Sequence, residues 1–335
     1  MFIYFCYMNG EELYEVISAL SKEAGFVDFG AAPVEKLTTE RLHLEEYIAE
    51  GHSAGMGYMA GNMSLREDPG LLLEGAKSVL CFLAPYKPLV LQDESLPQIA
   101  TYAYGMDYHR VIKDKLFKII KEIKTLIPEA TARAFTDSAP VFERAWAAKA
   151  GLGFIGKSTF LISRRYGLHT LIGVIILDRE VKYGKMVPAG CGKCTKCLDS
   201  CPTGALCRPF RVDARKCISY QTIESKKEYA QEEFIIDLKN SIFGCDICMN
   251  ACPWSAKGNP GLWQEFMPLS LAGYSKTLPE LNAGEWMAME EDTFKEYFSE
   301  SPLSRPGLQK IKSGLVEKKI SDEVANKSRN RNITI

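Results

Sequence analysis

The chain has 335 residues, of which 46% are hydrophobic and 25% are charged, so it can bury an ordinary core without cross-links. Its 41 basic and 42 acidic side chains give a formal charge of −1, which excludes a global basic field for nucleic acid or anionic membrane. No stretch approaches the roughly 18 apolar residues of a membrane span, and the short apolar start lacks the basic region and cleavage site of a signal peptide. We therefore expect a cytoplasmic, monomeric protein with no membrane partner.

Helices and strands alternate along the first half of the sequence. In chain order, the periodicity predicts a helix over residues 10–24, a strand over 27–32, a helix over 40–51, a strand over 77–86, a helix over 108–126, a strand over 132–135, a helix over 140–150 and a strand over 170–177. We therefore expect a domain of α/β or α+β class over residues 9–187. A cysteine-rich module follows over residues 188–256, and residues 257–335 are expected to form short C-terminal helices and a polar tail.

Eight of the eleven cysteines lie within 62 positions, which favours bound metal over disulfides in a chain without a secretion signal. The first four have the spacing Cys-x2-Cys-x2-Cys-x3-Cys-Pro, and they are Cys191, Cys194, Cys197 and Cys201. In bacterial ferredoxins with this spacing, the first three thiolates bind one cluster and the fourth binds the other. The spacing therefore predicts a ferredoxin-like module with two [4Fe–4S] clusters.

A second, incomplete run of the same kind ends at Cys252 and Pro253. Its first cysteine position is occupied by Ile242, so we expect the nearby Cys217 to replace it. Exchange of the last cysteine of each run between the clusters then defines two ligand sets. The first set is Cys191, Cys194, Cys197 and Cys252, and the second set is Cys201, Cys217, Cys245 and Cys248.

The alternative for these eight thiolates is a pair of zinc sites, because zinc takes four thiolates at a site. The two Cys-Pro endings favour iron–sulfur clusters over zinc. Cys207 is expected to be a spare or packing residue, and Cys6 and Cys81 to be structural. Two adjacent clusters form a one-electron path, which needs a terminal acceptor elsewhere in the chain.

Asp137 lies between a predicted strand and a predicted helix with Pro140 near its first turn. Folds of this class expose functional groups at such positions, so its carboxyl group could act as a general acid. The alternative is that Asp137 caps the helix that follows. Residues 151–158 have the composition of a phosphate loop without its spacing. They form either a helix end with a tight turn or a loop whose amides hold another large ligand.

Taken together, these motifs resemble the epoxyqueuosine reductase family. The resemblance rests on residues 136–159, 191–206, 217–220 and 244–254, with 55–59, 66–69 and 104–109 upstream. It covers roughly residues 10–255, and residues 301–305 extend it. Many members of that family continue into a C-terminal helical repeat domain, for which this sequence is too short, and Ser158 stands where the family usually has asparagine.

The resemblance implies a cobalamin-binding catalytic domain in an oxidoreductase related to reductive dehalogenases. Such an enzyme reduces epoxyqueuosine to queuosine at the wobble position of the tRNA anticodon, the last step of queuosine biosynthesis, with electrons from an external flavodoxin- or ferredoxin-type donor. Asp137, which matches the acid of the family, would donate a proton to the epoxide oxygen. The implied cobalamin contacts are Arg66, Asp137, Phe142, Gly156, Lys157, Ser158, Leu161, Ile172, Ser219, Asp246 and Ile247.

A candidate tRNA surface lies between Lys182 and Lys216, where eight basic and two acidic residues give a local charge of +6. The alternative is that these charges compensate anionic clusters and solvate the surface. His109 is expected to be structural or a hydrogen-bond partner rather than a cobalt ligand. Two other functions stay open: a reductase of a small molecule with the same cofactors, and an electron carrier without chemistry of its own.

Overall fold

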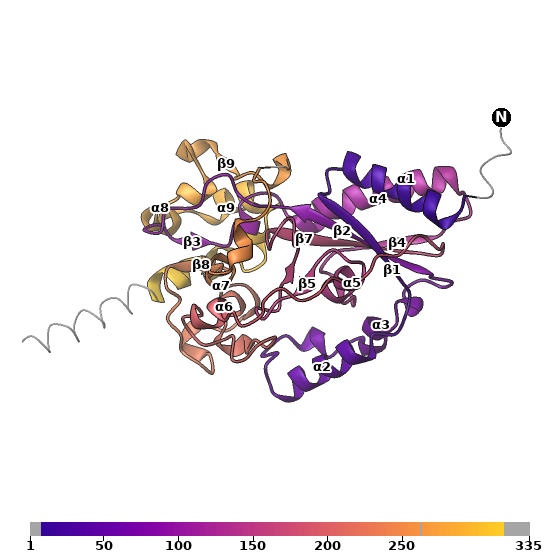
Figure 1. Ribbon diagram of the computed structural model, residues 1–335. Helices are drawn as coiled ribbons and strands as arrows, with labels where there is room; N and C mark the ends of the chain where they lie inside the picture. Colours follow the sequence, from indigo (N-terminus) through magenta and orange to yellow (C-terminus); the bar gives the residue numbers. More distant parts are fainter. Residues whose placement is uncertain (1–7, 262, 318–335) are drawn as a thin grey trace, which may run out of the picture.

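The computed structural model describes residues 8–261 and 263–317 (Figure 1). The centre of the first half is a four-stranded sheet in the order β1-β2-β7-β4, and every neighbouring pair is antiparallel. Its strands are β1 (Asp28–Pro33), β2 (Ser78–Pro85), β4 (Ala132–Phe135) and β7 (Thr170–Leu177). Of the two predicted classes, α+β describes this antiparallel sheet.

Helices cover both faces of the sheet (Figure 1). The flanking helices are α1 (Gly10–Glu23) and α4 (Tyr108–Leu126) on one face and α5 (Glu143–Lys149) on the other. Alternate residues of the central strand β2 pack against the two helical layers in turn, because successive strand residues point to opposite faces. Leu80 and Phe82 pack with α1 and α4, whereas Val79 and Cys81 pack with α5. Cys81 is fully buried in this layer, so the expectation that it is structural is confirmed.

The predicted elements are confirmed within one to three residues at each end. The predicted helix over 40–51 corresponds to α2 (Thr38–Ala49), which has Leu37 at its N-cap position and no side-chain cap. The helix predicted over 140–150 begins only at Glu143. The sequence pattern gave no signal for the short helix α3 (Met63–Glu67) or the strand β3 (Gln98–Ile99).

The residues after Gly151 form a small hairpin. Its strands are β5 (Phe154–Ile155) and β6 (Leu161–Ile162), and residues 156–160 form the turn between them. Gly151 itself has a left-handed φ of 86° and lies just after the end of α5. A helix end followed by a tight turn therefore describes the backbone of residues 151–158.

The cysteine-rich module and the C-terminal segment pack together beside the sheet (Figure 1). The helices and strands of the module are α6 (Lys196–Asp199), a π-helix over Tyr220–Glu224, β8 (Ser241–Phe243) and α7 (Ile247–Asn250). The C-terminal segment contains β9 (Ser270–Leu271), β10 (Lys276–Thr277), α8 (Ala283–Ala288), α9 (Glu291–Phe298) and a helix from residue 307 to the last described residue.

The segment boundaries at 187 and 256 stay predictions, because contacts cross both of them. β3 pairs in parallel with β8, and Tyr104 shares an apolar cluster with Phe243 and Trp286. Among the described helices, none combines the length and the apolar character needed to cross a membrane. Cys6 and the predicted polar tail at 327–331 lie outside the described residues.

Candidate active site

Asp137 follows β4 directly, at the edge of a cavity. Its φ of 54° is in the left-handed region, which is uncommon for a residue other than glycine and is often found at functional turns. The helix α5 starts six residues later with Phe142 at its N-cap position, so Asp137 does not cap it. The alternative structural role for Asp137 is therefore wrong, and its side chain is left for the cavity, where it is 58% exposed.

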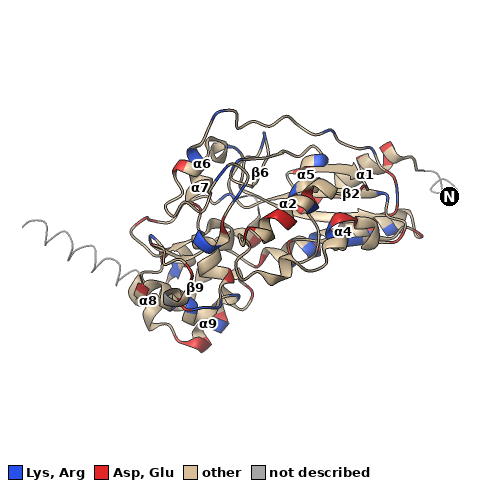
Figure 2. Ribbon diagram, turned by 90° about the horizontal axis from the view of Figure 1, so that it is seen from below, with Lys and Arg blue, Asp and Glu red and all other residues tan. Residues whose placement is uncertain are grey.

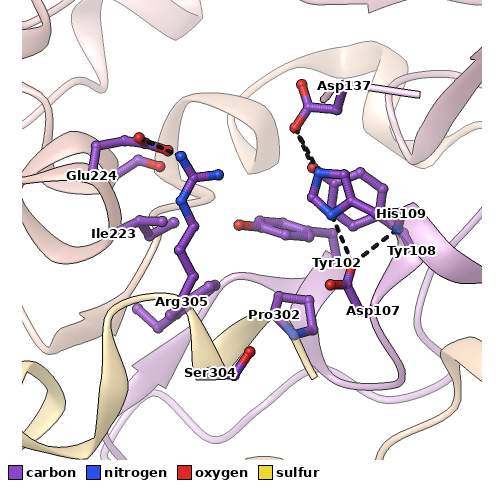
Figure 3. A pocket seen from close by; sticks show the side chains of 12 residues that line it. Tyr102, Asp107, Tyr108, His109, Asp137, Ile223, Glu224, Pro302, Ser304 and Arg305 are labelled. Carbon is purple, nitrogen blue, oxygen red and sulfur yellow. Dashed lines mark hydrogen bonds and ion pairs between the residues drawn. The ribbon is translucent and has the colours of Figure 1, made fainter. Parts of the chain in front are cut away.

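Two consecutive residues of α4 hold the Asp137 carboxylate (Figure 3). The Tyr108 hydroxyl donates a hydrogen bond to Oδ2, and His109 Nε2 lies 3.3 Å from the same oxygen. The other ring nitrogen of His109, Nδ1, lies 2.7 Å from Oδ1 of Asp107, the N-cap residue of α4. His109 thus connects two carboxylates, which confirms its expected role as a hydrogen-bond partner.

The electrostatics of this trio place the proton on the imidazole. The hydrogen bond from His109, helped by the one from Tyr108, lowers the pKa of Asp137 to about 2 although burial opposes the shift. Burial disfavours the charged imidazole, but Asp107 and Asp137 together outweigh it and raise the pKa of His109 to about 9. Burial and the neighbouring Asp137 raise the pKa of Tyr108. At neutral pH the site therefore holds an Asp137 carboxylate beside a protonated His109.

Glu143, the first residue of α5, fixes the backbone of this turn. Its Oε1 accepts the N–H of Asp137 at 2.8 Å. Lys113 of α4 adds a second support, because its Nζ donates to Oγ of Ser138 at 2.8 Å. Burial, followed by the charge of Asp137, raises the pKa of Glu143 to about 7. The sequence pattern gave Glu143 no role beyond its place in a motif.

The cavity has a volume of about 170 Å³ and lies between the sheet domain, the cysteine module and the C-terminal segment (Figure 3). Asp137 and the start of α4 form one side. The opposite side is formed by Arg305, whose Nη2 donates to Oε2 of Glu224 at 2.6 Å, and by the turn at Pro302. Ser219, two residues after Cys217, lines the same cavity. Tyr102, Ile223, Phe243 and Ser304 complete the lining together with Asp107.

The eight cysteines of the module approach one another as two groups. In one group, Cys252 interacts electrostatically with Cys191 and Cys194, and Cys197 interacts with Cys191 and Cys252. In the other group, Cys248 interacts with Cys201, Cys217 and Cys245. All of these contacts fall within one of the two predicted ligand sets. Across residues 8–261 and 263–317, no three His, Cys, Asp or Glu side chains converge as a single metal ion would require.

The two groups differ in their surroundings. Cys194 of the first group is exposed, and it lies in a run of exposed residues from Gly192 to Lys196. In the second group, burial raises the pKa of Cys217, and burial raises that of Cys245 to about 12. Cys207 belongs to neither group and has only a weak contact, 3.8 Å from its Sγ to the Arg211 carbonyl oxygen.

The residues predicted to contact cobalamin are distributed over several environments. Ser219 and Asp137 line the cavity. Asp246 and Ile247 line a second cavity of about 170 Å³, and Oδ2 of Asp246 accepts hydrogen bonds from the backbone N–H and hydroxyl of Thr101. Leu161 is buried in the apolar cluster around α5, with Phe142 and Ile172 packed against it.

The remaining residues of this prediction lie at α3 and in the hairpin turn. Arg66 ends near the Tyr58 carbonyl oxygen, and its Nε is buried without a hydrogen-bond partner in the described part of the chain. Gly156 and Ser158 are buried, whereas Lys157 donates from Nζ to the carbonyl oxygens of Gly192 and Cys194. Lys157 therefore contacts the loop of the first cysteine group.

The predicted basic surface is divided by ion pairs. Arg208 and Arg211 both pair with Glu46 and Glu50, and Arg211 is buried. Arg215 pairs with Asp213 and Glu233, and Lys182 with Glu11. Four of the eight basic residues thus pair with carboxylates, mostly from distant parts of the sequence, and the candidate tRNA surface stays a prediction.

Matches to known protein families define the class to which this protein belongs. Residues 190–255 match the family described as "4Fe-4S double cluster binding domain", so the cysteine module carries two [4Fe–4S] clusters, and the zinc alternative is not supported. Residues 66–138 match the family described as "Epoxyqueuosine reductase QueG, DUF1730". The protein is thus an iron–sulfur redox protein of α+β fold.

Individual relatives define the family. A protein named epoxyqueuosine reductase from Cellulophaga algicola is 38% identical over 309 residues, which cover 92% of this chain and 99% of the relative. A solved epoxyqueuosine reductase from Streptococcus thermophilus is 26% identical, with a TM-score of 0.78, covering 91% of this chain and 80% of that one. Another, solved with an epoxyqueuosine-modified tRNA-Tyr stem loop, is 25% identical, with a TM-score of 0.79 and coverage of 92% and 81%. The chain belongs to the epoxyqueuosine reductase family and is an oxidoreductase.

Several contacts of the cavity had no signal in the sequence, although Arg305 lies in the segment 301–305 that extends the family resemblance. Glu224 and Arg305 meet across 81 positions, and Tyr102 lies on a short 3-10 turn between unrelated segments. Tyr108 had been read only as the first residue of a helix within a motif. Only an alignment of relatives or the fold itself could have associated these side chains with Asp137.

Proposed function

We propose that this protein reduces epoxyqueuosine in tRNA to queuosine, and that Asp137 delivers a proton to the departing epoxide oxygen. The observation that carries the proposal is the Asp137 carboxylate itself, held at a cavity edge by Tyr108 and His109 and backed by Glu143. Membership of the family supports the reaction, and the solved relative with a bound tRNA stem loop supports the substrate.

The reaction needs two electrons and two protons, because the epoxide becomes an alkene and its oxygen leaves as water. With a pKa near 2, the Asp137 carboxyl group is rarely protonated at pH 7, but its protonated form is a strong acid. His109, with a pKa near 9, holds the proton and is 3.3 Å from Oδ2 of Asp137. Because transfer of this proton to the Asp137 carboxylate is uphill by itself, we propose that it passes through Asp137 only as negative charge develops on the departing oxygen. The Tyr108 hydroxyl holds Oδ2 of Asp137 in place by a hydrogen bond.

One buried side chain, in α3 and outside the lining of the Asp137 cavity, fits a large polar cofactor in a respect that does not depend on relatives. The buried Nε of Arg66 has no partner among the described residues, and a buried donor of this kind normally has one. We propose cobalamin, held by Arg66, Ser219 and Asp246, with residues 156–158 at its edge. When bound, cobalamin supplies a low-valent cobalt that is strongly reducing and nucleophilic. Phe142, Leu161 and Ile172 would support it from the apolar core.

The two clusters supply electrons one at a time. We propose that Cys191, Cys194, Cys197 and Cys252 bind one, and that Cys201, Cys217, Cys245 and Cys248 bind the other. Cys217 of the second set lies two residues before Ser219, which lines the cavity, and this supports the proposal that the second set delivers electrons to the reaction. Their source is a separate donor protein, and the enzyme works in the cytoplasm as a monomer.

The proposal is tested by incubating the reconstituted holoenzyme with epoxyqueuosine-containing tRNA and analysing its nucleosides by mass spectrometry. Removal of a general acid costs about 10²- to 10⁴-fold, so Asp137→Asn should lose that much turnover. The variant should keep its cluster absorbance. Asp114→Asn, at an exposed position on α4, is the control and should turn over like the wild type.

Full activity of Asp137→Asn would remove Asp137 from the chemistry. Equal turnover of the free nucleoside and of the tRNA would favour a small-molecule reductase, and failure to bind any corrinoid would favour an electron carrier.

A further inference from the structure

The loop of the first cysteine group has the features of a docking surface. Gly192, Lys193, Cys194, Thr195 and Lys196 are five consecutive exposed residues, and Lys196 begins the helix α6. The cavity of Asp137 includes Ser219, beside the second group, and none of the described residues of this loop. Cys194 of the first group is therefore exposed to solvent, while Cys217 of the second group lies two residues from the cavity-lining Ser219.

The charge around this loop is positive. From Val181 to Leu198 the sequence contains four lysines and no acidic residue. Two further cations lie against the loop. Lys157 donates to the carbonyl oxygens of Gly192 and Cys194, and Arg164 donates to the Pro188 carbonyl oxygen at 2.7 Å. Figure 2 shows the basic segments along the chain that leads into α6.

These cations are not neutralised as the arginines of the module are. Within residues 8–261 and 263–317, Lys193, Lys196, Lys157 and Arg164 form no ion pair, whereas Arg208, Arg211 and Arg215 each pair with a carboxylate. The nearest acid, Asp199, accepts a hydrogen bond from Thr195. Exposed Met186 and Pro188 add a small apolar area to the same chain segment.

We propose that the surface around Gly192–Lys196 is the docking site of an acidic one-electron carrier protein, such as a flavodoxin. The inference rests on the proposed function, which requires an electron source. Small interfaces with complementary charge suit such transient encounters, and complementary charge chiefly raises the association rate. Because electron transfer falls off steeply with distance, the exposed cysteine loop is where a protein donor can approach a cluster most closely.

Each encounter transfers one electron. The flavodoxin hydroquinone is oxidised to the semiquinone, and the cluster held by the first group is reduced. Two encounters supply the two electrons that one epoxide consumes, and the two protons come from water through the active-site acid. RNA is the other polyanion that could bind cations here, but the loop lies apart from the cavity in which the tRNA base must react.

The test uses holoenzyme with Lys193→Glu and Lys196→Glu combined. The matched control carries Lys121→Glu and Lys124→Glu, two exposed lysines of α4 that undergo the same charge change. Bleaching of the cluster absorbance by flavodoxin hydroquinone is followed by stopped flow, without tRNA. Turnover of epoxyqueuosine-containing tRNA is measured separately with flavodoxin and with excess reduced methyl viologen.

We expect the loop variant to lose at least tenfold in the second-order rate with flavodoxin at low salt, and the loss to vanish near 0.5 M salt, because steering is screened. Turnover with methyl viologen and the KM for tRNA should stay within about twofold of the wild type. The control should behave as the wild type. If the loop variant loads iron poorly, Lys193→Gln with Lys196→Gln should show a smaller loss of the same sign.

An unchanged rate with flavodoxin would overturn the proposal, and so would an equal loss with both reductants. A raised KM for tRNA as the main effect would assign the surface to RNA instead. If no preparation reduces epoxyqueuosine while flavodoxin still bleaches the clusters with the expected charge dependence, the docking surface stands and the proposed function fails.

Discussion

The two cysteine groups of the module each contain four thiols, but only the first has an exposed member. The first lies in an exposed loop among unpaired cations of the described chain, with Cys194 at the surface. The second is enclosed, with Cys217 two residues from the cavity-lining Ser219 and Cys245 beside the hydrogen-bonded Asp246. We propose that this difference gives the module a direction, with electrons arriving at the exposed loop and leaving beside Ser219 at the cavity.

The largest effect on this contrast between the two cysteine groups is expected when a predicted ligand of the second group is removed. Cys217→Ala should lower the iron content from about eight to about four per chain and abolish turnover, because the path to the cavity is cut. Cys207→Ala is the matched control, since Cys207 is exposed and its thiol makes a long contact with the Arg211 carbonyl oxygen, and it should keep both clusters. Iron near eight in Cys217→Ala would show that another residue is the ligand.

The role of the cavity can be tested through Glu143, which we treat as a residue that positions Asp137. Glu143→Ala leaves the N–H of Asp137 without its acceptor and should lower kcat about tenfold at an unchanged KM, since a hydrogen bond contributes about 0.5–1.5 kcal/mol. Glu143→Gln keeps an acceptor oxygen and should restore most of the rate. Equal rates for Ala and Gln would argue that the hydrogen bond is unimportant.

The same residue makes a prediction on stability. The pKa of Glu143 is raised to about 7 in the folded protein, so its favourable contribution is present below about 4.5 and is lost as pH rises through about 7. Glu143→Gln cannot ionise and should therefore unfold at a higher temperature than the wild type at pH 8, but not at pH 4.5. A thermal unfolding series at the two pH values checks the sign.

A smaller effect is expected in the dependence of turnover on pH. His109 is protonated below about 9, so activity limited by proton supply should fall as pH rises through that value. Asp107→Asn preserves the cap of α4 but removes one negative neighbour, and should move this basic limb to lower pH by about one unit. Asp114→Asn should leave the limb in place. An unshifted limb in Asp107→Asn would mean that another group titrates.

Sequence patterns predicted those parts of the molecule that depend on short spacing. The cysteine runs define the cluster module because a cluster needs thiolates at fixed local intervals, and the position of Asp137 after a short strand followed from neighbouring residues. Helix α4 could be predicted to the residue, since its apolar side chains recur at helical spacing and Asp107 caps it.

What the patterns missed depends on contacts between distant segments. The antiparallel order β1-β2-β7-β4 is set by strand pairing that local periodicity does not encode. The count of basic residues over 182–216 could not include Glu46 and Glu50, which neutralise Arg208 and Arg211 from α2 and its end. Likewise, Asp137 was identified alone, because His109 reaches it only after α4 packs on β4.

The direction of electron flow is tested most directly by removing the exposed group and leaving the enclosed one. Holoenzyme with Cys191→Ala and Cys194→Ala should keep about four irons per chain. With flavodoxin hydroquinone as the reductant, its reduction of epoxyqueuosine in tRNA should be at least a hundredfold slower than that of the wild type. Turnover at the wild-type rate in this variant would contradict the account, because electrons would then reach the cavity without passing the surface group.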